Sequence, residues 1–412
     1  MVEVPTWPRF SGPQIIDLKL DRIQKFLDKI GNPERNITNI IHVAGTNGKG
    51  STISFMKTLF ENAGYSVNCY TSPHLISFNE RIRIKGGLIS DKYLNKLSRF
   101  CDNICQENPD ITLTFFEGTT ILAILAFAEN PADINIFETG MGGRLDATNI
   151  FQQVTAAVIT PIAMDHQEFL GDNLADIASE KAGIIKSGSK VFIGKQNEEI
   201  YQILVEKSYE KSAQIFTYNH DFSYQKEGYI DNKLANIIKI GNLPLVGDHQ
   251  KYNFTLALKV FFELTNYQNL NFSLSKLSWP GRITYLDNLP DKYSKLDVWV
   301  DGGHNKHAAQ AIARWAKHNQ IDHIIIAMNK SKNLSDYINE FRTIKASVYF
   351  TEMTIFKDCY KVTDIKQYST FFKQQYHDPI IALDHIENGR VLICGSLYLI
   401  GEVMQRFGIK II

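Results

Sequence analysis

The segment at residues 40–52, which reads IIHVAGTNGKGST, constrains the fold of this chain more than any other part of the sequence. It predicts a buried strand, a glycine-rich turn and the start of a helix, because apolar residues continue after it at helical spacing. The backbone amides of such a turn bind an anion, Lys49 adds a positive charge, and Ser51 or Thr52 supplies a hydroxyl to a magnesium ion. Gly50 separates Lys49 from Ser51, which departs from the strict Walker spacing. We predict a nucleotide-phosphate loop, and an ordinary βα turn is the alternative.

Length and composition limit the classes of protein that the chain represents. At 412 residues it exceeds the size at which one core keeps growing, so two domains are expected. Lys plus Arg and Asp plus Glu number 44 each, so the charge balance favours neither a nucleic-acid nor a membrane partner. The sequence has no apolar run of membrane-spanning length and no signal-peptide pattern, which predicts a cytoplasmic protein. Five scattered cysteines predict no disulfide framework, and Cys101 and Cys105 are expected to be buried rather than to share a metal ion.

Strand and helix patterns alternate along most of the chain, which predicts an α/β protein with doubly wound, mostly parallel sheets. Half-buried alternation also predicts a strand over residues 78–84. In open parallel sheets, ligands bind beyond the carboxyl ends of the strands. Four residues follow predicted strands and are therefore expected at one edge of the sheet: Gly45, Ser72, Glu138 and His166.

The sequence WPGR at residues 279–282 interrupts this alternation, and a new series of predicted strands begins at residue 296. We take the interruption as the domain boundary, because Pro and Gly mark breaks between elements. The prediction is a phosphate-loop ATP-binding domain over residues 1–278, a hinge over residues 279–284, and a smaller Rossmann-like α/β domain over residues 285–412.

A second polar run, ETGMGGRLDATN at residues 138–149, places a carboxylate at a strand end before a flexible loop. Magnesium prefers hard oxygen ligands, so Glu138 suits an ion that is bound together with nucleotide phosphates. A helix-cap or salt-bridge role is the alternative for Glu138. A lone histidine is usually structural, but His166 is expected at the same sheet edge as Glu138.

Ten motifs together resemble the folylpolyglutamate synthase and dihydrofolate synthase family, which is related to the Mur ligases, and they occur in the family's order from about residue 15 to the C-terminus. The resemblance implies a Mur-ligase-like phosphate-loop domain followed by a Rossmann-like domain. The matching strings are HVAGTNGKGS (42–51), TSPHL (71–75), FNERI (78–82), FE (116–117), ETGMGGRLDATN (138–149), EKAGII (180–185), GDHQ (247–250) with Asn253, WPGR (279–282), DGGHN (301–305) and GSLY (395–398).

The resemblance implies that the protein binds ATP and two magnesium ions. The residues expected to bind ATP are Gly45, Thr46, Asn47, Gly48, Lys49, Gly50, Ser51, Asn253 at the adenine, Arg282 and Asp301. The residues expected at the metal ions are Ser72 and Glu138 for the first, and Glu138, His166 and Lys181 for the second. Lys181 resembles a lysine that this family carbamylates, and burial near magnesium would lower the pKa of its amine enough for attack on carbon dioxide. An unmodified lysine on a helix surface is the alternative.

The resemblance also assigns roles to the hinge, the second domain and the acid substrate. Asp301 is expected to meet the ribose, and His304 and Arg282 are expected to reach the phosphates. The expected catalytic residues are Lys49, His166, Lys181, Arg282 and His304. The residues expected to bind the pterin substrate are Asp17, Leu18, Lys19, Leu20, Thr114, Phe115, Phe116, Glu117, Leu145, Asp146 and Ala147. The sequence departs from the family pattern at Pro161, Thr284, Gly303 and Lys306, where Ser, Glu, Ala and Pro are usual.

The implied activity is the ATP-dependent addition of L-glutamate to dihydropteroate and to reduced folates, as in the bifunctional bacterial members. Phosphorylation turns a carboxylate into an electrophile, and the residues near ATP would align the reactants and neutralise charge. One alternative is a member with only one of the two activities, and another is an inactive nucleotide-binding scaffold. A Mur-type amino acid ligase is disfavoured, because about 44 residues before Gly45 are too few for a UDP-binding domain. The expected partners are small molecules, and the expected state is a monomer.

Overall fold

A computed structural model describes residues 17–225, 228–232, 238–265, 273–275, 277–409 and 411. The chain divides into two compact units. The first comprises Met1–Leu243 and Lys251–Leu277, and the second comprises Pro244–Gln250 and Ser278–Ile412. Residues 244–250, which lie within the predicted first domain, group with the second unit, and a Cβ atom at Gly247 would lie 3.6 Å from Cδ1 of Ile283.

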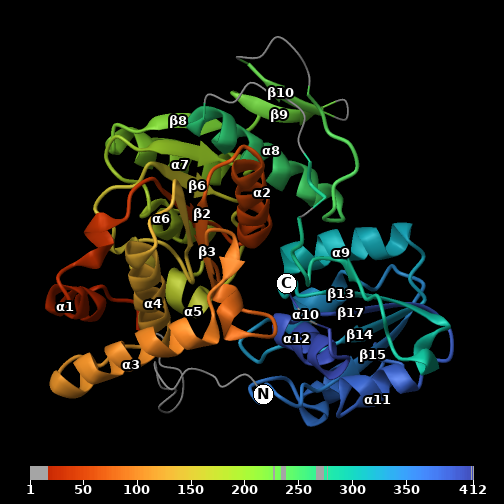
Figure 1. The fold of residues 1–412 in the computed structure, drawn as a ribbon. Coiled ribbons are helices and arrows are strands. Elements are labelled where there is room, and N and C mark those ends of the chain that lie inside the picture. Colours follow the sequence, from red (N-terminus) through yellow and green to blue (C-terminus); the bar gives the residue numbers. More distant parts are fainter. Residues whose placement is uncertain are drawn as a thin grey trace. The chain divides into compact units, whose positions relative to one another are not determined.

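The first unit is built on a large, mostly parallel sheet with the strand order β4-β3-β2-β5-β1-β6-β7-β8 (Figure 1). β1 lies between β5 and β6: the chain leads from β1 to β2 on one side of it, and later from β5 to β6 on the other side. Ligands bind at such switch points in open α/β sheets. The strands are β1 (Ile40–Ala44), β2 (Val67–Tyr70), β3 (Ile82–Ile84), β4 (Gly87–Leu88), β5 (Ile134–Glu138), β6 (Ala156–Ile159), β7 (Lys190–Ile193) and β8 (Gln214–Thr217). The predicted doubly wound α/β architecture is confirmed.

Helices connect these strands. The α-helices are α1 (Asp21–Lys29), α2 (Lys49–Asn62), α3 (Asp91–Glu107), α4 (Phe115–Glu129), α5 (Gln167–Leu170), α6 (Leu174–Ala182), α7 (Glu198–Glu210) and α8 (Asp248–Leu264). Short 3-10 helices occur at η1 (Pro33–Asn36), η2 (Phe78–Arg81) and η3 (Ala147–Ile150). A small antiparallel sheet, in the order β11-β10-β9, consists of β9 (Phe222–Gln225), β10 (Gly228–Asp231) and β11 (Ile238–Lys239).

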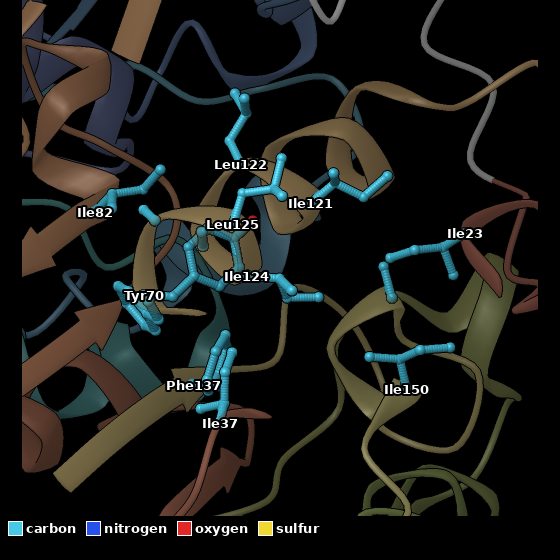
Figure 2. Packing of buried hydrophobic residues seen from close by; sticks show 14 of the residues in the cluster. Ile23, Ile37, Tyr70, Ile82, Ile121, Leu122, Ile124, Leu125, Phe137 and Ile150 are labelled. Atoms are coloured by element: carbon cyan, nitrogen blue, oxygen red, sulfur yellow. The ribbon is translucent and has the colours of Figure 1, made fainter. Parts of the chain in front are cut away.

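Strand register shows which side chains share a face of the large sheet. His42 of β1 pairs with Phe137 of β5 and Ala157 of β6, so these three residues point to one face. Buried residues of α4, α6 and α7 cover this face. Figure 2 shows the part of this core around Tyr70 and Phe137, whose ring centroids lie 6.2 Å apart.

The opposite face is covered by α2 and α8. Phe192 of β7 points to this face, opposite to its neighbours in the strand, and its ring stacks on that of Phe216 with 4.9 Å between the ring centroids. The Nζ atom of Lys259 in α8 lies 4.9 Å from the centroid of the Phe216 ring. The α2 and α8 helices pack together through Phe55 and Phe254, whose ring centroids are 5.0 Å apart. The sheet is therefore buried on both faces, as a parallel sheet requires.

The second unit has its own mostly parallel sheet and its own core. The strand order is β12-β13-β17-β14-β15-β16, in which β12 runs antiparallel to β13 and the other pairings are parallel. The strands are β12 (Thr284–Tyr285), β13 (Leu296–Asp301), β14 (His323–Ile326), β15 (Ser347–Thr351), β16 (Gln374–Tyr376) and β17 (Gly389–Cys394). The helices are η4 (Asp291–Tyr293), α9 (Lys306–His318), α10 (Leu334–Asn339), η5 (Val362–Tyr368), α11 (Pro379–Asp384) and α12 (Leu397–Arg406).

The prediction of one strand over residues 78–84 is wrong in its first half. Residues 78–81 form η2, and β3 begins only at Ile82. The Glu80 carboxylate accepts hydrogen bonds from the amides of Leu75, Ile76 and Ser77, which forms a capping box and holds the chain in a helical turn. Among the described residues, no helix has the length and apolarity needed to cross a bilayer.

Candidate active site

A glycine-rich loop joins β1 to α2 and forms the amino end of that helix. Gly48 precedes α2 with a φ of 88°, and a Cβ atom there would lie 2.5 Å from Oδ1 of Asn253. Gly45 has a φ of 147°, and a Cβ atom there would lie 1.9 Å from Oγ1 of Thr160. Both positions therefore require glycine. The backbone amides at the start of α2 suit a phosphate group, and Asn253 lies beside this loop.

The segment after β6 holds the glycine-rich loop in place. The amides of Thr46 and Asn47 donate to the carbonyl of Pro161 at 3.0 and 3.1 Å. The Thr46 hydroxyl donates to the Ala163 carbonyl at 2.9 Å and accepts from the Ala163 amide at 3.0 Å. Pro161 takes part only through its backbone in these bonds, so the departure from serine at this position preserves them.

Gln196, which is not among the predicted site residues, supports this segment. Its Nε2 donates to the carbonyl of Thr160 and its Oε1 accepts from the amide of Ile162, both at 3.0 Å. Gln196 thus fixes the backbone on which the glycine-rich loop rests. No local pattern points to this role, because its partners lie more than 30 residues earlier in the chain.

Two predicted site lysines meet at one backbone carbonyl. The Nζ atoms of Lys49 and Lys181 each donate to the carbonyl oxygen of Gly45 at 3.0 Å. Lys181 is buried near the end of α6, and Ser51 is buried in the first turn of α2. The fold therefore brings Lys181 to the phosphate loop across 136 residues of sequence.

Glu138 and Ser72 also lie together at this sheet edge. Glu138 ends β5 and is 4 % exposed, and its Oε2 accepts from the Ser72 amide at 3.1 Å. The adjacent Thr139 amide donates to the carbonyl of Val43 in β1, so Glu138 lies next to the strand that leads into the phosphate loop. Within the described part of the chain, no three His, Cys, Asp or Glu side chains form a metal-binding group. A magnesium ion needs only one or two carboxylates when phosphates and water complete its shell, so Glu138 with the Ser72 hydroxyl fits a hard cation.

His166 occupies the end of the segment that follows β6. It has a φ of 52°, in the left-handed region, and its amide donates to Oδ1 of Asp165 at 3.0 Å. Its Nε2 lies 3.8 Å from Oδ2 of Asp165, and about a third of the side chain is exposed. The backbone around His166 is thus fixed by its acidic neighbour, and the ring remains accessible.

The loop after β5 packs closely against α4 and α6. A Cβ atom at Gly140 would lie 2.4 Å from the Phe116 ring, and one at Gly143 would lie 2.7 Å from the carbonyl of Glu180. Asp146, predicted to bind the pterin substrate, is buried, and its carboxylate accepts from the amides of Met141 and Thr148. These hydrogen bonds indicate that Asp146 fixes the conformation of the loop after β5.

The predicted pterin residues before α1 and at α4 are connected by Arg22, which is not among the predicted site residues. The Arg22 guanidinium donates to both carboxylate oxygens of Glu117 at 3.1 Å and to Asp17 at 2.7 Å. Glu117 also accepts from the Thr114 amide at 2.6 Å and completes the capping box of α4. The guanidinium lowers the pKa of Asp17. The pattern of Thr114 followed three residues later by Glu117 is the sequence signal for this cap.

The remaining predicted pterin residues differ in exposure. Lys19 is exposed and lies 3.5 Å from Asp17, whereas Ala147 is buried at the start of η3. Leu20, Phe115 and Phe116 are half-buried and pack against the core around Tyr70. Leu18 is also half-buried and packs against the core beneath α6. Leu145 is also half-buried.

In the second unit, Asp301 ends β13 in a buried position. Its carboxylate accepts from the amides of Gly303 at 2.7 Å and Ile283 at 2.9 Å. Burial raises the pKa of Asp301, while the nearby charge of Arg282 opposes the shift. Nδ1 of His304 lies 3.0 Å from the carbonyl of Gly302.

Thr284, at a position where the family usually has Glu, fixes the backbone of the preceding turn. Its hydroxyl accepts from the amides of Gly281 and Arg282 at 3.0 and 3.3 Å and orders the backbone at the start of the second unit. The second unit therefore presents a fixed turn that carries Arg282 and, through Ile283, is tied to Asp301.

A glycine-rich loop at the switch point of a parallel sheet, followed by a second α/β unit, is the arrangement expected of an ATP-dependent ligase of the Mur type. The Mur ligase middle domain family matches residues 43–261, and the C-terminal domain of dihydrofolate synthetase matches residues 284–406. The dihydrofolate synthase/folylpolyglutamate synthase of Bacillus subtilis is 32% identical to this chain over 428 residues, and the match covers 94% of this chain and 94% of that protein.

Solved structures of related proteins agree with this classification. Mycobacterium tuberculosis folylpolyglutamate synthase complexed with ADP matches with a TM-score of 0.84 and 27% identity, covering 96% of this chain and 95% of that one. The bifunctional folylpolyglutamate synthase/dihydrofolate synthase from Yersinia pestis, complexed with AMPPNP and a Mn ion, matches with a TM-score of 0.81 and 25% identity, covering 97% and 96%. The chain therefore belongs to the dihydrofolate synthase/folylpolyglutamate synthase family of ATP-dependent ligases.

Proposed function

We propose that this protein adds L-glutamate to dihydropteroate and to reduced folates, with the first activity favoured, through an acyl phosphate intermediate. The observation that carries the proposal is the arrangement around Gly45, where Lys49 and Lys181 donate to one carbonyl at the sheet edge that also holds Glu138. A member with one of the two activities is the alternative.

The chemistry requires activation of a poor electrophile. A carboxylate oxygen of the acid substrate attacks the terminal phosphorus of ATP, ADP leaves, and an acyl phosphate forms. The neutral amine of glutamate then attacks the acyl carbon, phosphate leaves, and an amide bond remains. Lys49 and the amides of the glycine-rich loop would align the phosphates and offset their charge, which is the main requirement of phosphoryl transfer.

Divalent metal ions are part of the proposal. Glu138 and the Ser72 hydroxyl would hold one magnesium ion, and Glu138, His166 and carbamylated Lys181 would hold a second. When bound, these ions would supply charge neutralisation at the phosphates. Support comes from the buried carboxylate of Glu138 and from the Mn ion in the related Yersinia pestis structure.

Residues of both units are proposed to contact ATP. Asn253 beside Gly48 would contact the adenine, Asp301 the ribose, and Arg282 and His304 the phosphates. His304 or carbamylated Lys181 would take up a proton from the attacking amine. We further propose that the enzyme acts as a cytoplasmic monomer on small-molecule substrates, which size-exclusion chromatography with light scattering would test.

The decisive experiment measures glutamate-dependent ADP release with dihydropteroate and with tetrahydrofolate, and identifies the products by mass spectrometry. We expect turnover with both acids and faster turnover with dihydropteroate. Lys49→Ala should lose activity, whereas Lys57→Ala, which removes a lysine paired with Glu61 on the same helix, should retain it. Turnover with one acid alone would establish the single-activity alternative, and no glutamate-dependent ADP release with either acid would refute the proposal.

A further inference from the structure

A buried histidine lies in the strand that leads into the phosphate loop. His42 is fully buried in the middle of β1, three residues before Gly45. Burying an imidazole costs free energy unless its nitrogen atoms are hydrogen-bonded. The phosphate loop and the proposed metal ligands leave the presence of a histidine at this position unexplained.

His42 starts a chain of hydrogen bonds that ends in the loop after β5. Its Nε2 lies 2.8 Å from Oγ1 of Thr148, and the Thr148 hydroxyl donates to Oδ1 of Asp146 at 2.5 Å. The Asp146 carboxylate also accepts from the amides of Thr148 at 2.9 Å and of Met141 at 2.8 Å. One strand of the sheet is thereby connected to a loop that lies about 100 residues later in the chain.

The direction of these bonds fixes the tautomer of the histidine. A hydroxyl has one proton to donate, and that of Thr148 is directed at the carboxylate of Asp146. Thr148 must therefore accept from His42, so the proton of His42 lies on Nε2. The other ring nitrogen, Nδ1, is buried and has no hydrogen-bond partner among the described residues. Burial, with a smaller contribution from Lys186, lowers the pKa of His42 to about 3, which keeps the ring neutral.

We propose that His42 is a positioning residue for the acid substrate, because it orients Asp146 through Thr148 and so sets the loop of residues 140–148. The inference rests on the proposed function and on the expectation, drawn from the family resemblance, that the segment of Leu145, Asp146 and Ala147 lies at the pterin substrate. His42 suits this task because β1 is hydrogen-bonded on both sides, to β5 and β6, and cannot shift to follow the loop. The Nε2 proton is thus presented to Thr148 from a fixed point.

The role predicts a specific pattern among substitutions of His42. Glutamine places an amide donor near the position of Nε2, asparagine places it near the position of Nδ1, and leucine has no donor. We expect His42→Leu and His42→Asn to raise KM for dihydropteroate about tenfold, a size typical of lost supporting contacts. We expect KM for ATP to stay within about twofold, and His42→Gln to restore most of the loss.

A control separates positioning from general destabilisation. Asn68 is a buried polar residue in the amino-terminal half of β2, with bonds to Asn130 and Asn135. Asn68→Ala should lower the unfolding temperature without changing KM for dihydropteroate. The double variant His42→Leu with Thr148→Val should raise KM no more than the larger single effect, because both changes break the same chain of bonds.

Hydrogen exchange gives a readout that does not depend on turnover. His42→Leu and His42→Asn should increase exchange at residues 140–148 relative to wild type, and His42→Gln should not. A wild type that turns over neither acid would end the proposed function, while the exchange pattern would still judge the connection from His42 to the loop. Equal rescue by asparagine and glutamine, an equal rise in both KM values, or unchanged exchange at residues 140–148 would overturn the inference.

Discussion

Two lysine side chains share the carbonyl oxygen of Gly45, and the chemical state of Lys181 decides what they do there. As an amine, Lys181 donates to Gly45 and supports the backbone of the phosphate loop. As a carbamate, it would present oxygen atoms and a negative charge to a metal ion beside Glu138. Both states would make Lys181 essential, so loss of activity on substitution alone does not distinguish them.

Chemical rescue distinguishes the two states of Lys181. Lys181→Ala should lower kcat by about 100-fold, the size seen when one preorganised charge contact is removed. Added acetate should restore part of the activity, because a free carboxylate can replace the carbamate, and added ethylamine should not. Steady-state kinetics with each additive measures the effect, and the purified wild type should lose activity when it is depleted of carbon dioxide. Rescue by ethylamine but not by acetate would instead assign the role to the amine.

At the scale of elements, α1 and α4 are joined by one buried ion pair. Arg22 of α1 contacts Glu117 in the first turn of α4, and Glu117 is nearly fully buried. Arg22→Met would leave this carboxylate without its cation, which costs about 2 kcal/mol after allowance for the partial exposure of Arg22.

Arg22→Met should therefore lower the free energy of unfolding by about 2 kcal/mol, measured by urea denaturation. KM for dihydropteroate should rise and KM for ATP should not, because the pair fixes the segments at Asp17 and Thr114. Combining Arg22→Met with Glu117→Gln should recover part of the stability, since the amide keeps a hydrogen-bonding group without the buried charge. A double variant less stable than Arg22→Met would contradict this account.

Elements with local sequence signals could be predicted, whereas contacts between distant segments could not. The phosphate loop was visible because strand, turn and helix signals lie within a few residues of Gly48. The strand over residues 78–84 was predicted incorrectly because a local capping box at Glu80 outweighs the alternation. The contacts of Arg22 with Glu117, of Gln196 with the segment after β6, and of His42 with Thr148 have no such local signal, because they join segments 34 to 106 residues apart. Lys181 was found only through family resemblance.

At the scale of the whole molecule, each unit has its own sheet and core, so ligand binding can be followed in each unit separately. A ligand that binds only the folded state stabilises it by about 2.7 kcal/mol at 100 times its Kd. The phosphate loop lies in the first unit, and the proposed ATP contacts Arg282 and Asp301 lie in the second. Nucleotide should therefore affect both units if those contacts form.

AMPPNP with magnesium should raise the unfolding temperature and slow hydrogen exchange at residues 45–52 and at residues 281–284. EDTA should remove most of both effects, because the triphosphate would then meet the Glu138 carboxylate without a cation between them. Lys49→Ala should lose the effect in both units, whereas Arg282→Ala should keep protection at residues 45–52 and lose it at residues 281–284. Scanning calorimetry and exchange mass spectrometry measure the two effects. Full protection in EDTA would exclude a metal-dependent nucleotide site, and protection at residues 281–284 that persists in Arg282→Ala would exclude Arg282 as the nucleotide contact.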